Sequence, residues 1–383
     1  MSFIRHSGEL HANGNKEFRR ENPHSRTRVQ ERDHTLRSSL QPAHDEVHEN
    51  RHVKGGKGCQ RTRHAGPSRR PIVQDMDLQG TGCEGHVQSC KGGITMIERA
   101  SCRGAVTIVN AIPTGIGSAM GIMLQLDAEV RLSQDDGSVR LEGTEEGTDL
   151  VRGCIEGVGK RAGMRDLSGI VTIRSDIPVS RGLKSSSAAS NAVVLAASRA
   201  LNIHMSDEEI IGLAIDESIK AGVTVTGAFD DASACFHGGA VITDNKARRI
   251  LKRWHVQDPV TVLLHVPERR IRKEDVKNMD FSPVISQVKE AIESALKGDY
   301  PRAMELNSKA CSKILDVSEE VAEAARRSGA IAAGISGTGP ATAVLVRHED
   351  IGRIMDILES FDGTIISAEL NDTPAREVVP RQS

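Results

Sequence analysis

Aromatic residues are scarce in this sequence, because tryptophan, tyrosine and phenylalanine together make up 2% of its 383 residues. So small a share leaves little material for the base-stacking platforms that single-strand nucleic-acid-binding proteins use. An excess of basic charge is lacking too, since 50 Lys and Arg residues stand against 52 Asp and Glu residues. A nucleic-acid-binding protein normally carries a basic field. We therefore expect no nucleic-acid partner.

Uninterrupted apolar runs long enough to cross a membrane are also missing. Two uncharged stretches, 104–126 and 328–346, approach the roughly 20 residues that span a bilayer. Glycine and proline interrupt both in the middle, so each reads as a strand, a glycine loop and another apolar element. The seven cysteines form no regular disulfide framework, which favours a reduced protein. We therefore expect a soluble, cytoplasmic protein without membrane association.

Large apolar residues are rare in residues 1–95, where Leu, Ile, Val and Phe occupy only 14 positions. This segment holds 9 of the 14 histidines and a charge of +5, whereas the remaining 288 residues carry −7. A segment so poor in apolar residues buries too little surface to offset the entropy cost of folding. We therefore expect 1–95 to be a disordered extension, and we hypothesise that Met96 is the true start of the protein.

Residues 1–95 also lack the features of a targeting sequence. They contain no apolar core of the secretory type, and their 11 acidic residues argue against a transit peptide. They do contain potential zinc ligands, which are Cys59, His64, Cys83, His86 and Cys90. Because a structural zinc site needs four well-placed ligands and this spacing matches no compact zinc module, we interpret the cluster as chance.

From Met96 onward the apolar periodicity predicts an α+β protein. The expected strands are 105–109, 123–132, 139–142 as the return strand of a hairpin, 169–175, 240–243, 260–266, 330–335, 341–346 and 364–368. The expected helices are 148–163, a helix from about 189 to 201, 206–221, 282–297, 301–311, 317–328 and 349–360. We read 246–254 as a basic connector and expect a domain boundary near 255, between a domain of residues 96–255 and one of residues 256–383.

The strongest chemical signal is the sequence Pro178-Val-Ser-Arg-Gly-Leu-Lys-Ser-Ser-Ser-Ala directly before an alanine-rich helix. A helix N-terminus presents unpaired N–H groups and the positive end of the helix dipole, which attract anions. Serine hydroxyls can bind phosphate oxygens or Mg²⁺, and lysine adds a positive charge. An ordinary capped loop is the alternative. The predicted phosphate-binding residues are Pro178, Val179, Ser180, Arg181, Gly182, Leu183, Lys184, Ser185, Ser186, Ser187 and Ala188.

Acidic residues at unusual positions give two further signals. Glu217 falls inside the apolar arc of helix 206–221, where an unpaired carboxylate is costly and a cation or metal would stabilise it. A boundary carboxylate that reaches solvent is the alternative. Asp230 and Asp231 follow a glycine-rich loop, and adjacent acids that point in different directions can divide the roles of base and structural group. A solvated turn is the alternative there.

The segment Gly334-Ile-Ser-Gly-Thr-Gly-Pro340 lies between two predicted strands and is longer than a hairpin turn requires. Its glycines allow a ligand to approach the backbone closely, and its N–H groups can form an anion-binding nest. A plain hairpin turn is the alternative. The candidate residues that hold substrate or phosphate are Gly334, Ser336, Gly337, Thr338 and Gly339.

These segments, in this order, resemble the motifs of the GHMP kinase superfamily. Residues 178–189 match its second motif, P-x-x-x-G-L-G-S-S-A-A, except that Lys184 replaces a glycine and one serine is additional. The sequences Gly182-Leu-Lys-Ser-Ser-Ser-Ala, Asn110-Ala-Ile-Pro-Thr-Gly-Ile-Gly and Gly227-Ala-Phe-Asp-Asp-Ala-Ser-Ala are most similar to archaeal-type shikimate kinases. The resemblance covers residues 96–383 and none of 1–95.

The resemblance implies a GHMP-kinase-like α+β fold, with an N-terminal domain like ribosomal protein S5 domain 2, a ferredoxin-like C-terminal domain and ATP between them. It also implies that Ser187 and Glu217 hold Mg²⁺ and that Asp230 is the catalytic base, with Asp231 where asparagine is usual. Ile116 stands where some relatives carry a lysine near the acceptor. We therefore take Lys184 as the candidate catalytic cation.

The implied activity is the ATP-dependent phosphorylation of shikimate to shikimate 3-phosphate, a step of chorismate and aromatic amino-acid biosynthesis. Homoserine kinase or another small-alcohol kinase remains an alternative, as does a non-catalytic nucleotide-binding module. The acceptor carboxylate calls for an arginine, for which the candidates are Arg269, Arg270 and Arg272. The sequence leaves open whether the protein is a monomer or a homodimer, and whether Asp230 or Asp231 is the base.

Overall fold

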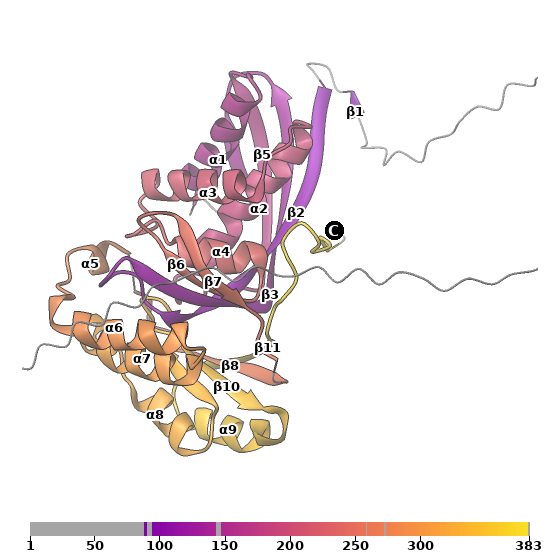
Figure 1. Ribbon diagram of the computed structural model, residues 1–383. Helices are drawn as coiled ribbons and strands as arrows, with labels where there is room; N and C mark the ends of the chain where they lie inside the picture. The colour runs from indigo at the N-terminus through magenta and orange to yellow at the C-terminus, as the bar shows by residue number, and fades with distance from the viewer. Residues whose placement is uncertain (1–87, 90–93, 143–146, 258, 272, 382–383) are drawn as a thin grey trace, which may run out of the picture. The chain divides into compact units, whose positions relative to one another are not determined.

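The computed structural model describes residues 88–89, 94–142, 147–257, 259–271 and 273–381. These residues form two β-sheets and the helices that cover them, so the α+β class expected from the sequence is confirmed (Figure 1). The strands of the first sheet are β1 (Gln88–Ser89), β2 (Ile94–Val109), β3 (Ile116–Gln134), β4 (Val139–Glu142), β5 (Leu167–Ser175), β6 (Ala240–Asp244) and β7 (Arg249–Trp254).

The long strand β3 organises the first sheet. It pairs antiparallel with β2 along most of its length, with β6 through its N-terminal part and with β5 through its C-terminal part. Leu126, Val130 and Leu132 are buried on one face, because successive side chains of a strand point to opposite faces. The period-two alternation that predicted a strand here reflects this burial.

Among the described residues, the helices α1 (Thr148–Arg161), α2 (Ser185–Ala200), α3 (Asp207–Lys220) and α4 (Phe229–His237) form the layer over the first sheet. The helices α2 and α4 pack against β2 and β3, and α1 and α3 pack against α2. The uncharged, alanine-rich sequence of α2 suits this central position, because a helix that is apolar all round is buried. The helix α3 begins with the expected capping box between Ser206 and Glu209.

The second sheet consists of β8 (Val260–Val266), β9 (Ala332–Ile335), β10 (Thr342–Arg347) and β11 (Thr364–Glu369), in the spatial order β11-β8-β10-β9. The helical segments of this part are α5 (Lys273–Lys277), η1 (Ser282–Val284), α6 (Ile285–Leu296), α7 (Tyr300–Leu315), α8 (Glu320–Arg327), η2 (His348–Asp350) and α9 (Ile351–Leu358). All strand pairs are antiparallel, and helices follow the first and third strands. This βαββαβ order confirms the expected ferredoxin-like arrangement.

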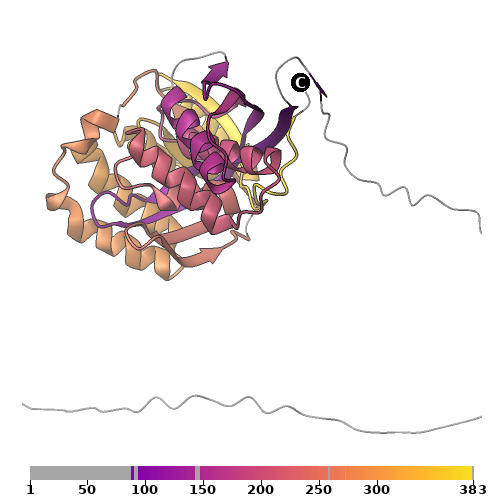
Figure 2. The ribbon, with the colours of Figure 1, turned by 90° about the horizontal axis from the view of Figure 1, so that it is seen from above.

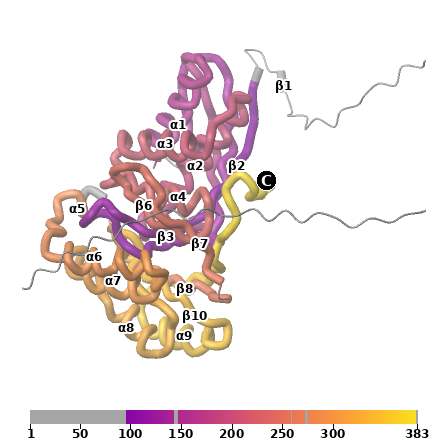
Figure 3. The backbone as a smooth tube through the Cα atoms, viewed as in Figure 1, coloured from indigo at the N-terminus to yellow at the C-terminus, as the bar shows by residue number. Residues whose placement is uncertain are grey.

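The end of the chain returns from the second sheet to the first. After β11, Leu370 forms a bridge with Ile122, and the Asn371 N–H donates to the Gly121 carbonyl. Figures 2 and 3 show this C-terminal segment in yellow, running back beside the indigo strand β2. Arg381 then pairs with the carboxylates of Asp127 and Asp176. The chain thus links the two sheets again after leaving the second one, while the division near residue 255 stays a proposal.

Three local expectations were wrong. The strand β4 does not return as a hairpin beside β3 but pairs in parallel with β5, because the helix α1 carries the chain across between them. The basic connector contains the strand β7, whose alternation Lys and Arg side chains conceal. The helix α4 was missed, because a glycine loop followed by two aspartates is typical of a turn.

The N-terminal expectations fall mainly on residues that the structure does not describe. The potential zinc ligands Cys59, His64, Cys83, His86 and Cys90 all lie outside the described residues, as does most of 1–95. The strand β2 begins at Ile94, and β1 pairs with its first two residues. Within the described ranges, no helix is long and apolar enough to cross a membrane.

Candidate functional site

Two neighbouring cavities lie around the N-terminus of α2. The smaller has a volume of about 40 Å³ and the larger a volume of about 740 Å³. Five residues line both, and they are Lys184, Thr224, Ala228, Asp231 and Thr338. The two cavities therefore adjoin at these five residues, which form a shared wall.

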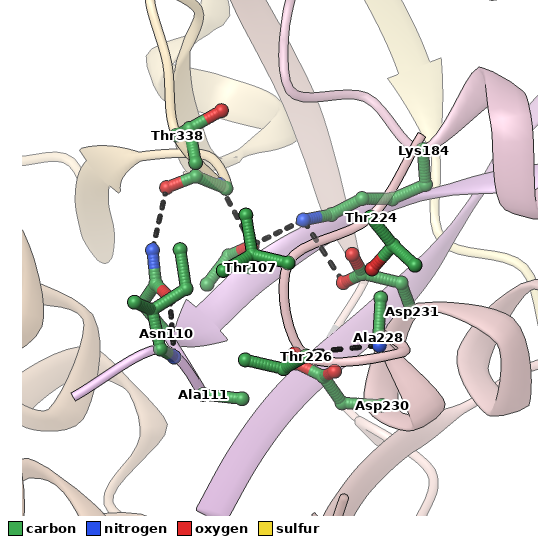
Figure 4. Close-up of a pocket in the computed structure, with 13 residues that line it drawn as sticks. Thr107, Asn110, Ala111, Lys184, Thr224, Thr226, Ala228, Asp230, Asp231 and Thr338 are labelled. Atoms are coloured by element: carbon green, nitrogen blue, oxygen red, sulfur yellow. Dashed lines mark hydrogen bonds and ion pairs between the residues drawn. The ribbon is translucent and has the colours of Figure 1, made fainter. Parts of the chain in front are cut away.

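Polar side chains dominate the smaller cavity (Figure 4). The end of β2, the loop before α4, the first turn of α4 and the loop after β9 all contribute to it. Its polar side chains are those of Thr107, Asn110, Lys184, Thr224, Thr226, Asp230, Asp231 and Thr338. Such a set of hydroxyl, amide and carboxylate groups suits a small molecule that carries several oxygen atoms.

Lys184 places its positive charge at the wall between the cavities. Its side chain is buried, with the ammonium 2.6 Å from Thr107 Oγ1 and 2.9 Å from Asp231 Oδ1 (Figure 4). The residue itself has φ = +68° at the N-cap of α2, a left-handed conformation that favours glycine. A lysine that accepts this backbone strain indicates that its side chain, rather than its backbone, is needed here.

The loop after β9 is hydrogen-bonded to the loop before α2. Gly337 donates its N–H to Thr107 Oγ1 at 2.7 Å and accepts a hydrogen bond from Asn110 Nδ2 at 3.0 Å. Ser336 Oγ donates to the Gly182 carbonyl at 2.8 Å, and a Cβ at Gly182 would overlap the Ser336 backbone. The two segments that the sequence singled out 150 residues apart therefore form one structure.

The five candidate residues of the loop after β9 do not all reach a cavity. Gly337 lines the smaller cavity and Thr338 lines both. Gly334 instead lies within β9, where a Cβ would meet Met304 and Ser308. Ser336 and Gly339 line neither cavity, and the buried Ser336 hydroxyl bridges the two loops.

Asp230 is the buried carboxylate of the smaller cavity, with only 4% of its surface exposed. Its Oδ1 accepts a hydrogen bond from Asn245 Nδ2 at 2.8 Å, and its Oδ2 lies so close to Gly117 that any Cβ there would overlap it. Burial and the charge of Asp231 raise the pKa of Asp230 to about 7, although Lys184 acts in the opposite direction. Such a carboxyl can take up a proton near neutral pH.

The two adjacent acids point in different directions, as the sequence suggested. Asp230 faces Asn245 and Gly117, whereas Asp231 forms the ion pair with Lys184. Neither side chain belongs to a solvated turn, because both lie in the first turn of α4 and line the smaller cavity.

The larger cavity combines an apolar wall with a polar end. Leu126, Leu141, Leu150, Val151, Ile173 and Ile215 supply apolar surface, which suits a flat base. At the polar end it is lined by most of the predicted phosphate-binding residues, namely Val179, Ser180, Gly182, Leu183, Lys184, Ser185, Ser186 and Ser187. Pro178, Arg181 and Ala188 do not line it.

Glu217 is buried in α3, as its position on the helical wheel predicted. Its charge is balanced by Lys220, whose ammonium lies 2.6 Å from Glu217 Oε1. The other carboxylate oxygen faces Gly153, where any Cβ would collide with it. Glu217 lines neither cavity, and the described residues contain no group of three or more His, Cys, Asp or Glu side chains that could hold a metal.

The two candidate arginines that the structure describes, Arg269 and Arg270, do not line the smaller cavity. Arg270 lines the larger cavity, Arg269 contacts Asp316 at the surface, and Arg272 lies outside the described residues. Ile116 lines neither cavity. Sequence reasoning missed Thr107 and Asn245, because nothing in an apolar strand or a strand end indicates that one side chain there faces a site.

Two family models match this chain. The model of the GHMP kinases N terminal domain matches residues 149–239, and the model of the GHMP kinases C terminal domain matches residues 287–362. Among curated proteins, a shikimate kinase from Methanothrix thermoacetophila is 41% identical over 280 residues, which cover 72% of this chain and 95% of the relative. A shikimate kinase from Methanosarcina acetivorans is 38% identical over 287 residues, covering 74% and 97% respectively.

Solved structures show the same fold. A homoserine kinase from Cytophaga hutchinsonii aligns with a TM-score of 0.60 at 17% identity, covering 75% of this chain and 98% of that structure. The mevalonate kinase of Methanococcus jannaschii aligns with a TM-score of 0.59 at 17% identity, covering 72% and 98%. At such identities the likeness concerns the fold alone, and it confirms the GHMP-kinase-like fold that the sequence motifs implied.

Proposed function

Because this chain belongs to the GHMP kinase family, we propose that it transfers a phosphoryl group from ATP to a hydroxyl group of shikimate, giving shikimate 3-phosphate. The relatives named shikimate kinase support the enzyme class, a phosphotransferase with an alcohol acceptor, and membership of the family implies the use of ATP. The choice of shikimate as the acceptor is supported by the relatives named shikimate kinase, which this chain matches over almost their entire length.

The observation that carries this proposal is the wall that the two cavities share. The larger cavity, with its apolar side and its serine-rich helix N-terminus, suits a nucleotide whose phosphates point to α2. The smaller cavity offers the hydroxyl, amide and carboxylate groups that an alcohol would contact, and its volume of about 40 Å³ must widen to admit a six-membered ring. The transferred phosphoryl group would then lie at Lys184 and Asp231, where the cavities meet, and phosphoryl transfer depends mainly on such positioning and charge neutralisation.

Charged side chains and backbone groups at and beside this wall have chemical roles in this proposal. Asp230 accepts the proton of the attacking hydroxyl, because it is the buried carboxylate whose pKa burial raises into the working range. Lys184 neutralises charge on the phosphoryl oxygens. The free N–H groups in the first turn of α2 bind phosphate oxygens. Asp231 holds the Lys184 ammonium in place.

We expect ATP to bind as its Mg²⁺ complex, and we propose Ser187 and Glu217 as the protein ligands of the ion. Hydroxyl and carboxylate oxygens are the hard donors that Mg²⁺ prefers. Ser187 lines the larger cavity, and the buried carboxylate of Glu217 has an exposed, exchangeable partner in Lys220, whose side chain is 66% exposed. The donor set therefore fits the ion, which would neutralise phosphate charge when bound with ATP.

The decisive experiment measures ADP release by the purified full-length chain with shikimate, homoserine or mevalonate as acceptor. We expect release with shikimate and a product whose mass has increased by one phosphate group. Release with homoserine only would replace shikimate by the alternative acceptor. Nucleotide binding without ADP release on any of the three alcohols would support the non-catalytic alternative.

The buried, free thiols at Cys102, Cys154, Cys235 and Cys311 support the proposal of a reducing cytoplasmic setting.

The raised pKa of Asp230 predicts the pH dependence of the reaction. A general base works only when deprotonated, and the pKa of Asp230 is about 7. We therefore expect kcat/KM for the alcohol to be constant above about pH 8 and to fall roughly tenfold for each pH unit below 6. Initial rates between pH 5 and 9 check this. A profile that stays flat down to pH 5 would contradict it.

Gly117 should be required for the position of the base. A Cβ at this glycine would overlap Asp230 Oδ2 and lie 2.8 Å from the Ala111 side chain. We expect Gly117→Ala to displace the carboxylate and to lower kcat by about 10-fold or more, since small displacements of reacting groups are costly. The matched control is Gly212→Ala in α3, which meets no atom within 4 Å and should keep the wild-type rate.

A further inference from the structure

Asn245 lies directly after β6 and lines neither cavity, yet it connects two residues of the smaller one. The residue is 5% exposed. The amide oxygen accepts hydrogen bonds from the Asp230 N–H at 3.1 Å and from Thr243 Oγ1 at 2.7 Å. The amide nitrogen donates to Asp230 Oδ1 at 2.8 Å and to Thr226 Oγ1 at 3.4 Å.

The neighbours of Asn245 determine which way its amide faces. The backbone N–H of Asp230 can only donate, so the side-chain atom opposite it must be the amide oxygen. A flipped amide would place its NH₂ group against that N–H and its oxygen against Asp230 Oδ1, so that donor would face donor and acceptor would face acceptor. The NH₂ group of Asn245 therefore faces Asp230 Oδ1 and Thr226 Oγ1 as a donor.

The orientation of Asn245 has a first consequence for Asp230. A donor on Oδ1 favours the ionised carboxylate and opposes the effect of burial. The charged groups that act on this carboxyl are Asp231 on the same helix and Lys184 at the start of α2. Gly117 of β3 and Asn245, directly after β6, are its uncharged neighbours. Asn245 therefore provides the neutral hydrogen bond that keeps the base able to accept a proton.

The second consequence concerns Thr226, whose side chain lines the smaller cavity. Its Oγ1 accepts hydrogen bonds from the Ala228 N–H at 3.3 Å and from Asn245 Nδ2 at 3.4 Å. A hydroxyl oxygen has two lone pairs and one hydrogen. Since both lone pairs are used, the hydrogen of Thr226 remains to donate to an oxygen atom of a bound molecule.

We propose that Asn245 is a positioning residue that sets the hydrogen-bond polarity of the smaller cavity, with Asp230 as acceptor and Thr226 as donor toward the bound alcohol. The proposal rests on the proposed function in one respect, that the molecule in this cavity is an alcohol. It assigns Asn245 no contact with the reacting atoms. Its effect passes through the two side chains that it orients.

The kinetic test uses Asn245→Asp, which keeps the shape and the oxygen that faces the Asp230 N–H. Its second oxygen carries lone pairs and charge where Asn245 has a donor. The acid limb is the part of the pH profile in which kcat/KM falls as the pH is lowered. We expect it to shift to higher pH by about one unit or more, because a like charge raises the pKa of a carboxyl. We also expect KM for the alcohol to rise, because Thr226 would turn its hydrogen to the new carboxylate.

A matched control separates this effect from general damage by a buried charge. Asn371 is also a buried amide, held by Arg103 away from both cavities. Asn371→Asp likewise replaces an amide donor, here the one to the Thr373 carbonyl, by a carboxylate oxygen, and it should leave the pH dependence and the KM for the alcohol unchanged. An Asn245→Asp enzyme with the wild-type acid limb and KM would overturn the proposal.

A second measurement needs no turnover, so its failure is distinct from a failure of the proposed function. A carboxyl whose pKa is raised by folding keeps its proton to a higher pH in the folded state than in the unfolded state. The free energy of unfolding therefore falls as the pH rises from about 4 to the folded pKa. In Asn245→Ala the loss of the donor should make the fall of Tm between pH 5 and pH 8 steeper than in the wild type. The extra steepness should vanish when Asp230→Asn is added, and its persistence would overturn the proposal.

Discussion

Asp230→Asn is expected to lower kcat by about 10²–10⁴, the usual cost of losing a general base. The substitution keeps the size of the side chain and an oxygen for the Asn245 amide, so the smaller cavity keeps its shape. Only the ability to take up a proton is lost. Steady-state rates at saturating ATP and alcohol measure the effect, and a near wild-type kcat would reject Asp230 as the base.

The stability of this variant shows whether the loss is chemical. The pKa of Asp230 is raised from 3.8 to about 7 in the folded protein, so the ionised side chain destabilises the fold above pH 7 and that cost disappears in acid. An asparagine never ionises. We therefore expect Asp230→Asn to melt at pH 8 no earlier than the wild type, so that a slow enzyme is still a folded one.

Asp231→Asn is the matched comparison, because it changes the neighbouring acid in the same way. Asp231 is the partner of Lys184, and its loss leaves a buried ammonium with Thr107 as its remaining partner among the contacts described above. We expect this variant to lose stability, with the acid limb of its pH profile still present. The opposite pattern, a base-like loss of rate at position 231 only, would exchange the roles of the two acids.

The second large effect is expected at Lys184. Lys184→Gly should lower kcat by about 10²–10³, the range for removing one group that stabilises charge in the transition state. It should also destabilise the fold by about 3 kcal/mol, because the Asp231 carboxylate, which is only 16% exposed, is left without its partner. Kinetics and denaturant unfolding measure the two losses separately.

The double variant Lys184→Gly with Asp231→Asn separates catalysis from folding. It removes both charges of the buried pair and places glycine at φ = +68°, where glycine is unstrained. We expect stability to return to the wild-type level while kcat stays as low as in Lys184→Gly. Recovery of the rate together with stability would mean that Lys184 serves the fold and not the reaction.

Local signals in the sequence predicted much of this fold. The capping box at Ser206 and the uncharged composition of α2 depend on neighbours within one or two helical turns, so they could be read directly. The same holds for the alternation in β3 and the strand 260–266. The parallel pairing of β4 with β5 could not be read in this way, because which strand lies beside another depends on the path of the whole chain.

The candidate site was accessible to sequence reasoning only in part. The loop before α2 and the adjacent acids stood out, because glycine, serine and aspartate at a helix start have a local meaning. The ion pair of Lys184 with Asp231 joins residues distant in the chain, and so does the contact of Asn245 with Asp230. The ion pair and this contact depend on burial and on partners that the fold brings together. Neither can be read from the residues that are adjacent in the sequence.

The wall that the two cavities share has a consequence for inhibitor design. A single compound that joins an adenine nucleotide to the acceptor alcohol through a phosphate bridge would fill both cavities across Lys184, Asp231 and Thr338. Such a bisubstrate compound loses translational and rotational freedom only once, whereas two separate ligands lose it twice. Its nucleotide half would be common to many kinases, so selectivity for this enzyme would come from the half that enters the smaller, hydroxyl-lined cavity.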